Sequence, residues 1–168
     1  MGELTSSISS GRNKSRDGGP IPVYGSTGII GYTDAPAYSG RALLVARVGA
    51  NAGRVNSVDG EYDVSDNTLV VRPIADWDLR FAFHQLVNMN INQYAKGGGQ
   101  PLITGGQLKA FEIPVPPLEE QRRIAGVLDK FEALVNSLTV GLPAELQARR
   151  QQYEYYRDKL LTFAEVAA

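Results

Sequence analysis

The sequence predicts an α+β protein: a mixed, strand-rich domain followed by a long, coiled-coil-like C-terminal helical arm. Two observations carry this prediction. Most of the 18 glycines precede Pro114, where they separate short β-prone runs. After Pro117 glycine nearly disappears and apolar residues recur at helical spacing. We therefore expect a domain at residues 1–117 and a helical spacer or dimerisation region at residues 118–168.

The expected strands of the first domain are short runs bounded by Gly, Asp or Pro. They are PVYG from Pro22, IIGYTD from Ile29, ALLVARVG from Ala42, GRVNSV from Gly53, TLVVRP from Thr68 and a last run at Phe111–Val115. The run from Ala42 is almost continuously apolar, which is typical of a buried strand. A helical pattern begins at Leu79, with Asp76 or Asp78 as its N-cap and Asn90 near its end. Residues 96–101 predict a flexible loop, and Gly106–Ala110 a short turn of helix.

The helical arm begins at Pro117. Glu119 and Glu120 complement the positive end of the helix dipole, and apolar residues then follow at alternating spacings of four and three. Gly141-Leu-Pro143 is expected to end this helix, with Pro143 opening a second one. Such seams pack either on a partner helix or, as a hairpin, on their own domain. The amount of apolar surface on the two seams favours a partner.

Composition limits the function classes. The 168 residues are 43% hydrophobic and 21% charged, as in a protein with a packed core. The absence of cysteine excludes disulfides and thiolate metal sites and suits a reducing cytoplasm. No stretch approaches the ~18 apolar residues of a membrane span. We expect a cytoplasmic protein without membrane contact.

The net charge of −1 argues against strong autonomous DNA binding, because phosphate contacts supply most of the non-specific affinity of such proteins. The charge is unevenly distributed along the chain. Residues 1–54 carry three more basic than acidic side chains, and residues 55–117 carry three more acidic than basic ones. The basic N-terminal part is therefore the better place to expect phosphate contacts.

The sequence contains no convincing catalytic or metal-binding constellation. His84 is the single histidine, and in a predicted helix we interpret it as structural. No P-loop motif and no Asn-Pro-Pro-aromatic motif of adenine methyltransferases is present. We interpret the acidic residues Asp59, Glu61, Asp63 and Asp66 as a solvated turn, because no lysine lies nearby to complete a nuclease site. We expect no enzyme, no cofactor and no metal.

Four stretches, in this order, resemble the DNA specificity subunits of type I restriction–modification systems. They are Ile21–Tyr32; Leu43–Val55 with Val64–Val71; Gly97–Leu108 running into Glu112–Asp129; and Gly141–Leu146 with Gln151–Leu161. Together they cover nearly the whole chain. The resemblance implies a target-recognition domain followed by a helix, and in this family two such domains usually read the two halves of a split DNA sequence while their helices pair antiparallel as a spacer.

This chain resembles one half of that arrangement, either as a half-subunit that dimerises or as a fragment or recombinable cassette. We expect a homodimer that presents two identical domains to inverted half-sites. The resemblance also implies a methyltransferase subunit and a restriction subunit as partners. The residues expected at the dimer or partner interface are Leu128, Phe131, Val135, Leu146, Tyr153, Tyr156 and Leu160.

The resemblance further implies that the first domain binds double-stranded DNA. Polar side chains would read base edges, and phosphate contacts would position the domain. The candidate residues lie in or beside the loops between the expected strands. They are Arg12, Lys14, Tyr24, Ser26, Thr27, Arg47, Asn51, Arg54, Lys96 and Gln100.

Two other functions remain open at this point. The chain could be a coiled-coil adaptor, such as a decoy subunit that holds the methyltransferase without reading DNA. It could also be the specificity subunit of a related system in which one partner chain fuses cleavage and methylation. Sequence-dependent protection of DNA would distinguish a specificity subunit from the adaptor. The partner genes would distinguish a type I system from the fused one.

Overall fold

The chain divides into two compact units. The computed structural model describes residues 1–12, 18–97 and 100–161. Contacts between Cα atoms separate Met1–Ala125, which we call the globular unit, from Gly126–Ala168, which we call the helical unit. The boundary expected from composition lies a few residues earlier, where the long helix begins.

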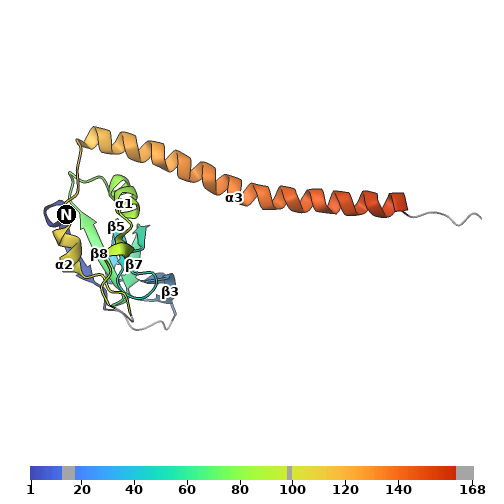
Figure 1. Cartoon of the computed structure of the whole chain (residues 1–168). Helices are drawn as coiled ribbons and strands as arrows, with labels where there is room; N and C mark the ends of the chain where they lie inside the picture. The colour runs from blue at the N-terminus through green and yellow to red at the C-terminus, as the bar shows by residue number, and fades with distance from the viewer. Residues whose placement is uncertain (13–17, 98–99, 162–168) are drawn as a thin grey trace, which may run out of the picture. The chain divides into compact units, whose positions relative to one another are not determined.

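The described residues form eight strands, three α-helices and two short 3-10 helices, so the α+β prediction is confirmed (Figure 1). The elements are η1 (Gly2–Leu4), β1 (Thr5–Ser10), β2 (Ile21–Gly25), β3 (Gly28–Thr33), β4 (Tyr38–Ser39), β5 (Ala42–Ala46), β6 (Val55–Val58), β7 (Glu61–Val64), β8 (Thr68–Pro73), α1 (Leu79–Asn88), η2 (Ile91–Tyr94), α2 (Gly105–Ala110) and α3 (Leu118–Leu161).

Two four-stranded sheets build the globular unit. The first has the order β1-β8-β5-β6, and all its neighbours are antiparallel. The second has the order β3-β2-β7-β4, in which β2 and β7 run parallel. The sequence missed β1, whose TSSISS run has Ile8 as its one large apolar residue. It also missed β7: the interpretation of this segment as a solvated turn is wrong at Asp63, which is buried in the strand.

The central strand β5 is buried on both faces, which explains its unbroken apolar run. Leu43 and Val45 belong to the larger apolar core, together with residues of α1 and α2. Ala42 and Leu44, which alternate with them, belong to a smaller core with Tyr62 and other residues of the second sheet. Because neighbouring side chains of a strand point to opposite faces, the first sheet forms the middle layer of the unit.

The N-cap prediction for α1 is confirmed at Asp78, whose carboxylate accepts from the backbone N–H groups of Arg80 (3.0 Å) and Phe81 (3.1 Å). The strand expected at Phe111–Val115 is wrong, because this segment has no regular structure. Its apolar side chains pack on the core, but the Pro114-Val-Pro-Pro117 run removes three of the backbone donors that a ladder needs.

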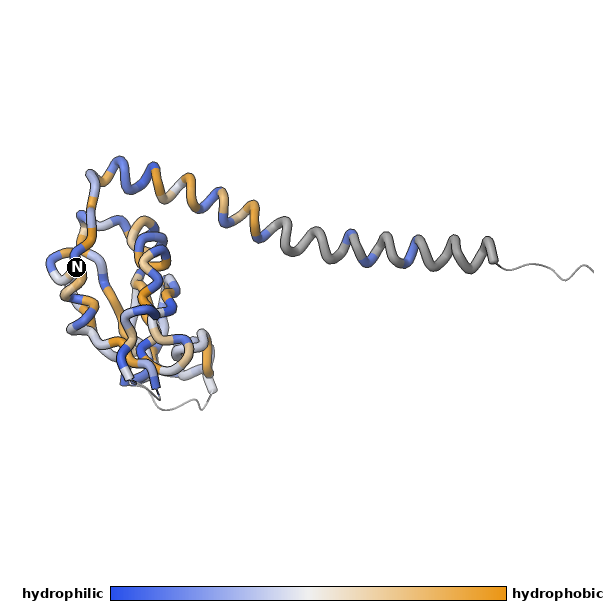
Figure 2. The backbone as a smooth tube through the Cα atoms, viewed as in Figure 1, coloured by the Kyte–Doolittle hydropathy of each residue, from blue (hydrophilic) through white to orange (hydrophobic). Residues whose placement is uncertain are grey.

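The helix α3 is continuous over 44 residues, so the break expected at Gly141-Leu-Pro143 is wrong. A proline inside a helix removes one backbone hydrogen bond and crowds the preceding turn, but the other bonds of a long helix can carry the chain across it. Polar and apolar residues alternate along the first part of α3 (Figure 2). None of the helices in the described part of the chain combines the length and apolar character needed to cross a bilayer.

The buried Gln121 side chain ties the first turn of α3 to the globular unit. It is 1% exposed. Its Oε1 accepts from the backbone N–H of Asp78 (2.8 Å), and its Nε2 donates to the carbonyls of Asp76 (2.9 Å) and Pro116 (2.8 Å). A single amide therefore joins α3, the start of α1 and the segment before α3.

We expect Gln121→Leu to lower the free energy of unfolding of the globular unit by about 2–4 kcal/mol, because three backbone groups lose their partner in a buried place. Urea unfolding followed by the fluorescence of Trp77, the single tryptophan, measures this. The matched control is Gln93→Leu, which removes an exposed side chain bonded to the Met89 carbonyl and should change the stability by less than about 0.5 kcal/mol. Equal effects of the two variants would contradict the role of Gln121.

Candidate nucleic-acid interface

One end of the globular unit gathers the loops that carry most candidate DNA contacts. At this end β1 pairs with the start of β8 (Ser10 opposite Leu69), and the end of β5 lies opposite Thr68. Because β2 and β7 are parallel, the β2–β3 and β7–β8 turns also lie there. We call this end the loop end. Its described segments are residues 11–12, 25–28, 47–54, 65–67, 95–97 and 100–103.

The β7–β8 turn holds the neighbouring segments by backbone hydrogen bonds. The N–H of Ser65 donates to the Tyr24 carbonyl (2.8 Å), and the N–H of Arg47 donates to the Asn67 carbonyl (2.8 Å). The guanidinium of Arg47 also reaches the Asp66 carbonyl (3.4 Å). The turn therefore fixes the ends of β2 and β5 relative to each other.

A second set of backbone hydrogen bonds joins residues 47–49 to residues 101–103. The N–H of Gly49 donates to the Pro101 carbonyl (3.0 Å), and the N–H of Ile103 donates to the Arg47 carbonyl (2.8 Å). Lys96 and Leu102 exchange both of their backbone hydrogen bonds (3.1 and 2.9 Å). These pairings bring Lys96 close to the loop that follows β5, although about fifty residues separate them in the sequence.

The turn at residues 49–54 is closed on itself and anchored from η2. The N–H of Arg54 donates to the Asn51 carbonyl (2.9 Å), and Nδ2 of Asn92 donates to the Ala52 carbonyl (2.8 Å). Gly53 has a φ of +88°, and its backbone lies against that of Asn92. This turn and the end of α1 enclose a surface hollow of about 520 Å³ with polar and apolar walls.

The candidates differ in their exposure. Thr27, Arg54, Lys96 and Gln100 are exposed at the loop end, while Ser26, Arg47 and Asn51 are half-buried there. Lys14 lies outside the described residues.

The two remaining candidates, Arg12 and Tyr24, differ in their surroundings. Arg12 is exposed after the end of β1 at the loop end, and it lines a second hollow of about 650 Å³ together with the buried Asp63. Tyr24 packs edge-on against Tyr62, with 6.3 Å between the ring centroids, so it supports the smaller core. Burial raises the pKa of the Tyr62 hydroxyl, which keeps this phenol neutral. The structure therefore sets Tyr24 apart from the exposed loop residues.

The sequence missed the asparagines that follow α1. Asn90, expected near the end of the helical pattern, lies beyond α1 in the left-handed region with φ of 47°. It lines the 520 Å³ hollow with Asn92 and Asn56. The only available signal was the asparagine-rich run NMNINQ, because asparagine tolerates a left-handed conformation better than most residues.

The two ends of the strands differ in charge. At the loop end, the exposed or half-buried charged side chains are Arg12, Arg47, Arg54, Lys96 and Asp66. At the opposite end, the strand ends are flanked mostly by acids: Glu3, Asp34, Asp59, Glu61 and Asp76, with Arg41 and Arg72. The net charge of the chain therefore conceals a basic end and an acidic end, and the basic end carries the amide and hydroxyl side chains.

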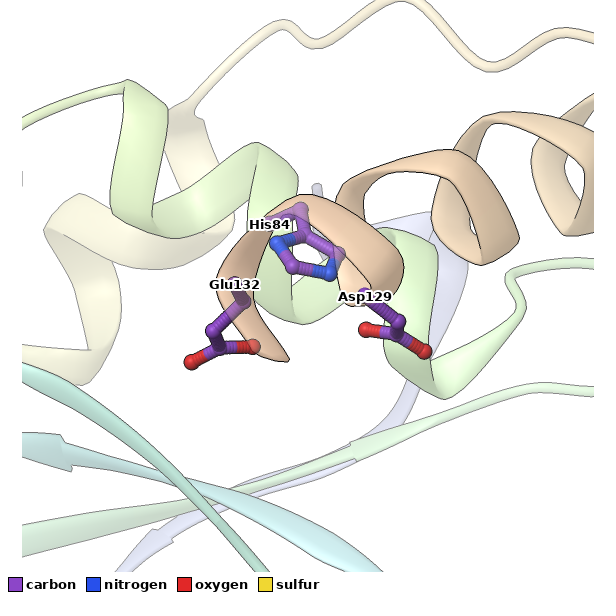
Figure 3. A group of neighbouring side chains, drawn as sticks. All are labelled: His84, Asp129 and Glu132. Atoms are coloured by element: carbon purple, nitrogen blue, oxygen red, sulfur yellow. The ribbon is translucent and has the colours of Figure 1, made fainter. Parts of the chain in front are cut away.

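His84 lies on α1, half-buried, with its ring edge-on to Phe83 at 5.3 Å. Figure 3 also labels Asp129 and Glu132, which lie one turn apart on α3. His84 belongs to the globular unit and the two carboxylates to the helical unit, so we assign the three residues no joint role.

The comparison with protein families decides the identity of the fold. The model of the type I restriction modification DNA specificity domain matches residues 5–148. The chain belongs to this family. The match covers the whole loop end of this specificity domain and much of α3.

Curated relatives of this specificity domain agree. The chain is 38% identical over 118 residues to the type I restriction enzyme EcoprrI specificity subunit of Escherichia coli, a match that covers 70% of this chain and 29% of the relative. It is 33% identical over 158 residues to a putative type I restriction enzyme specificity subunit of Haemophilus influenzae, covering 90% of this chain and 41% of the relative. The chain thus spans less than half the length of these relatives.

Solved structures share the fold of the specificity domain. The S subunit of a type I restriction-modification system from M. genitalium superposes with a TM-score of 0.68 at 21% identity, over 97% of this chain and 45% of that one. A chain from a study of complex assembly and conformational transition of the type I R-M system superposes with a TM-score of 0.69 at 25% identity, over 91% of this chain and 42% of that one.

The close approach at Gly53 yields a stability prediction. A Cβ at Gly53 would lie 2.4 Å from the Asn92 nitrogen, whereas a Cβ at Gly60, with a similar φ of +90°, would meet nothing within 4 Å. We expect Gly53→Ala to lower the free energy of unfolding by about 3 kcal/mol and Gly60→Ala by about 1 kcal/mol. Urea unfolding compares the two variants, and equal losses would contradict the packing of the 49–54 turn on η2.

Proposed function

We propose that this chain is the sequence-specific DNA-recognition component of a type I restriction–modification system. The globular unit reads one half of a bipartite DNA sequence. The helical unit pairs with a second long helix and takes part in docking the methyltransferase and restriction subunits. The chain supplies specificity and no catalytic chemistry, which belongs to its partners.

The observation that carries the proposal is the convergence of basic and amide side chains at the loop end of a specificity domain. Arginine, asparagine and glutamine are the side chains best suited to base edges in the major groove, and lysine and arginine to phosphates. Arg54, Asn51, Lys96 and Gln100 lie there, on segments joined by backbone hydrogen bonds. Because those segments are cross-linked, the side chains start from a fixed frame and lose less entropy on binding.

The low net charge fits this role. The basic end faces the phosphates. The acidic opposite end weakens binding little, because charges more than about 8–10 Å apart are largely screened at physiological ionic strength. The local charge of the loop end therefore matters more than the total of −1. Partner subunits would supply further phosphate contacts.

The exposed apolar residues of α3 support pairing with a second helix. Phe131 is 61% exposed, Val135 58% and Leu128 38%, and their spacing is that of a coiled-coil seam. Leu146, Tyr153, Tyr156 and Leu160 continue the sequence pattern, but their side chains lie outside the described residues. We propose a second copy of this chain as the partner, so that two-fold symmetry presents two domains to inverted half-sites.

DNA binding by the loop end predicts distinct effects of two alanine variants. Lys96→Ala should weaken binding to all duplexes alike and lower the salt slope of log K by about 1, because it loses one phosphate contact. Arg54→Ala should cost about 1–3 kcal/mol and relax the preference at one base pair. Fluorescence anisotropy with duplexes at several salt concentrations measures both.

The control is Arg41→Ala, which removes an exposed arginine from the opposite end and should leave affinity and salt slope unchanged. If Arg41→Ala weakened binding as much as the loop-end variants, the proposed DNA-binding surface would be wrong. If the wild-type chain protected no sequence in the presence of its methyltransferase subunit, the adaptor function would replace the proposed one.

Helix pairing predicts that Val135→Asp dissociates the oligomer, because it places a charge in an apolar seam. Asn136→Asp is the matched control: it adds the same charge to the neighbouring exposed position, outside the apolar seam. Size-exclusion chromatography with light scattering should show a dimer for the wild type and Asn136→Asp, and a monomer for Val135→Asp. A wild-type monomer at micromolar concentration would exclude the homodimer.

A further inference from the structure

The β2–β3 hairpin exposes apolar side chains close to the loop end. Ile29 is 52% exposed and Tyr32 is 47% exposed, although both lie in a strand of the second sheet. Residues 21–33 contain no charged side chain. Figure 1 shows β3 at the end of the globular unit that lies away from the N-terminus. The candidate DNA contacts of this hairpin, Tyr24, Ser26 and Thr27, are all hydroxyl-bearing residues.

A β-bulge places the two exposed side chains on one face. Gly31 pairs with Val23 and Ile29 pairs with Tyr24, so Ile30 is an extra residue in β3. In a regular strand, residues three apart point to opposite faces. The extra residue reverses this alternation, so Ile29 and Tyr32 lie on the same face as Tyr24.

The face that carries Tyr24, Ile29 and Tyr32 is covered along β2 and exposed along β3. Tyr24 of β2 packs against Tyr62 and the smaller core. The strand β3 is the edge of its sheet, one strand further out, and its side chains on this face stay exposed. Ile30, the bulged residue, is half-buried, and a Cβ at Gly25 would lie 2.9 Å from it. Ile30 therefore fills the space at the hairpin tip, and Ile29 is the apolar side chain presented beside the tip.

We propose that the β2–β3 hairpin enters the major groove of DNA and that Ile29 contacts the 5-methyl group of a thymine. This inference rests on the proposed function and names a specificity-determining residue within it. A two-stranded ribbon fits the major groove, which is about 12 Å wide. An aliphatic side chain cannot form a hydrogen bond with a base edge. It can bury the thymine methyl, which is the apolar group that a base displays in the major groove.

The surroundings favour DNA over a protein as the occupant of this face. The tip, Gly25-Ser-Thr-Gly28, belongs to the loop end, where Arg47, Arg54 and Lys96 supply positive charge for phosphates. The hairpin itself is neutral, so it can approach base edges without bringing a carboxylate near the backbone. Ser26 and Thr27 at the turn add hydroxyls that donate to or accept from either kind of base.

The test uses the full chain and a randomised duplex library, followed by sequencing of the bound fraction. Each thymine of the preferred sequence is then replaced by uracil, which removes only the methyl group. We expect one thymine at which uracil weakens wild-type binding about fourfold, the value of one buried methyl. Ile29→Ala should weaken binding to the thymine duplex by at least as much and abolish the difference between thymine and uracil. Ile29→Val should keep part of it.

Val127→Ala is the matched control, since Val127 on α3 is 44% exposed and belongs neither to the hairpin nor to the loop end. It should leave the thymine preference intact, and Trp77 fluorescence should show that every variant is folded. Three results would overturn the inference: a thymine preference that survives in Ile29→Ala, an equal weakening of all duplexes by this variant, or wild-type binding that is indifferent to uracil at every position. A wild-type chain without any sequence preference would instead refute the proposed function itself.

Discussion

The backbone hydrogen bonds of the β7–β8 turn hold the loop end together. Ser65 bonds to the end of β2 and Asn67 to the end of β5, so one tight turn connects the two sheets at the point where their strands end. The segment that carries Lys96 is joined to the same place through Arg47. Loops of a β-rich domain usually move more than its strands. Here the loops bond to one another, and their polar side chains therefore have a defined spacing.

The parts of the fold that the sequence predicts well are those decided by local chemistry. Asp78 can cap α1 wherever the helix packs, because its carboxylate accepts from backbone N–H groups of the first turn of the same helix. The short apolar run of β5 is typical of a buried strand, and the structure buries it on both faces. The missed strand β7 depends on distant partners, since Asp63 enters the fold through pairing with β2 and not through its own preference. Pro143 shows the reverse, a strong local signal that a long helix overrides.

The candidate site shows the same limit. Counted along the chain, basic residues prevail in 1–54 and acidic residues in 55–117. In the structure, basic residues prevail at one end of the strands and acidic residues at the other. Lys96, from the part counted as acidic, therefore joins Arg47 and Arg54 at the basic end. Arg41, from the part counted as basic, lies at the opposite end, and Tyr24 packs on the smaller core. Pairing distributes residues between the ends of a sheet, and no single-sequence pattern contains that information.

The separation of charge within the globular unit also has a kinetic consequence. A body with positive groups at one end and negative groups at the other has an electric dipole moment, even when its total charge is close to zero. In the field around a polyanion such a body turns before it touches, and the fraction of productive collisions rises. The acidic flank at Glu3, Asp59 and Glu61 would thus contribute to the rate of encounter by disfavouring approach from the wrong side, without contacting the nucleic acid.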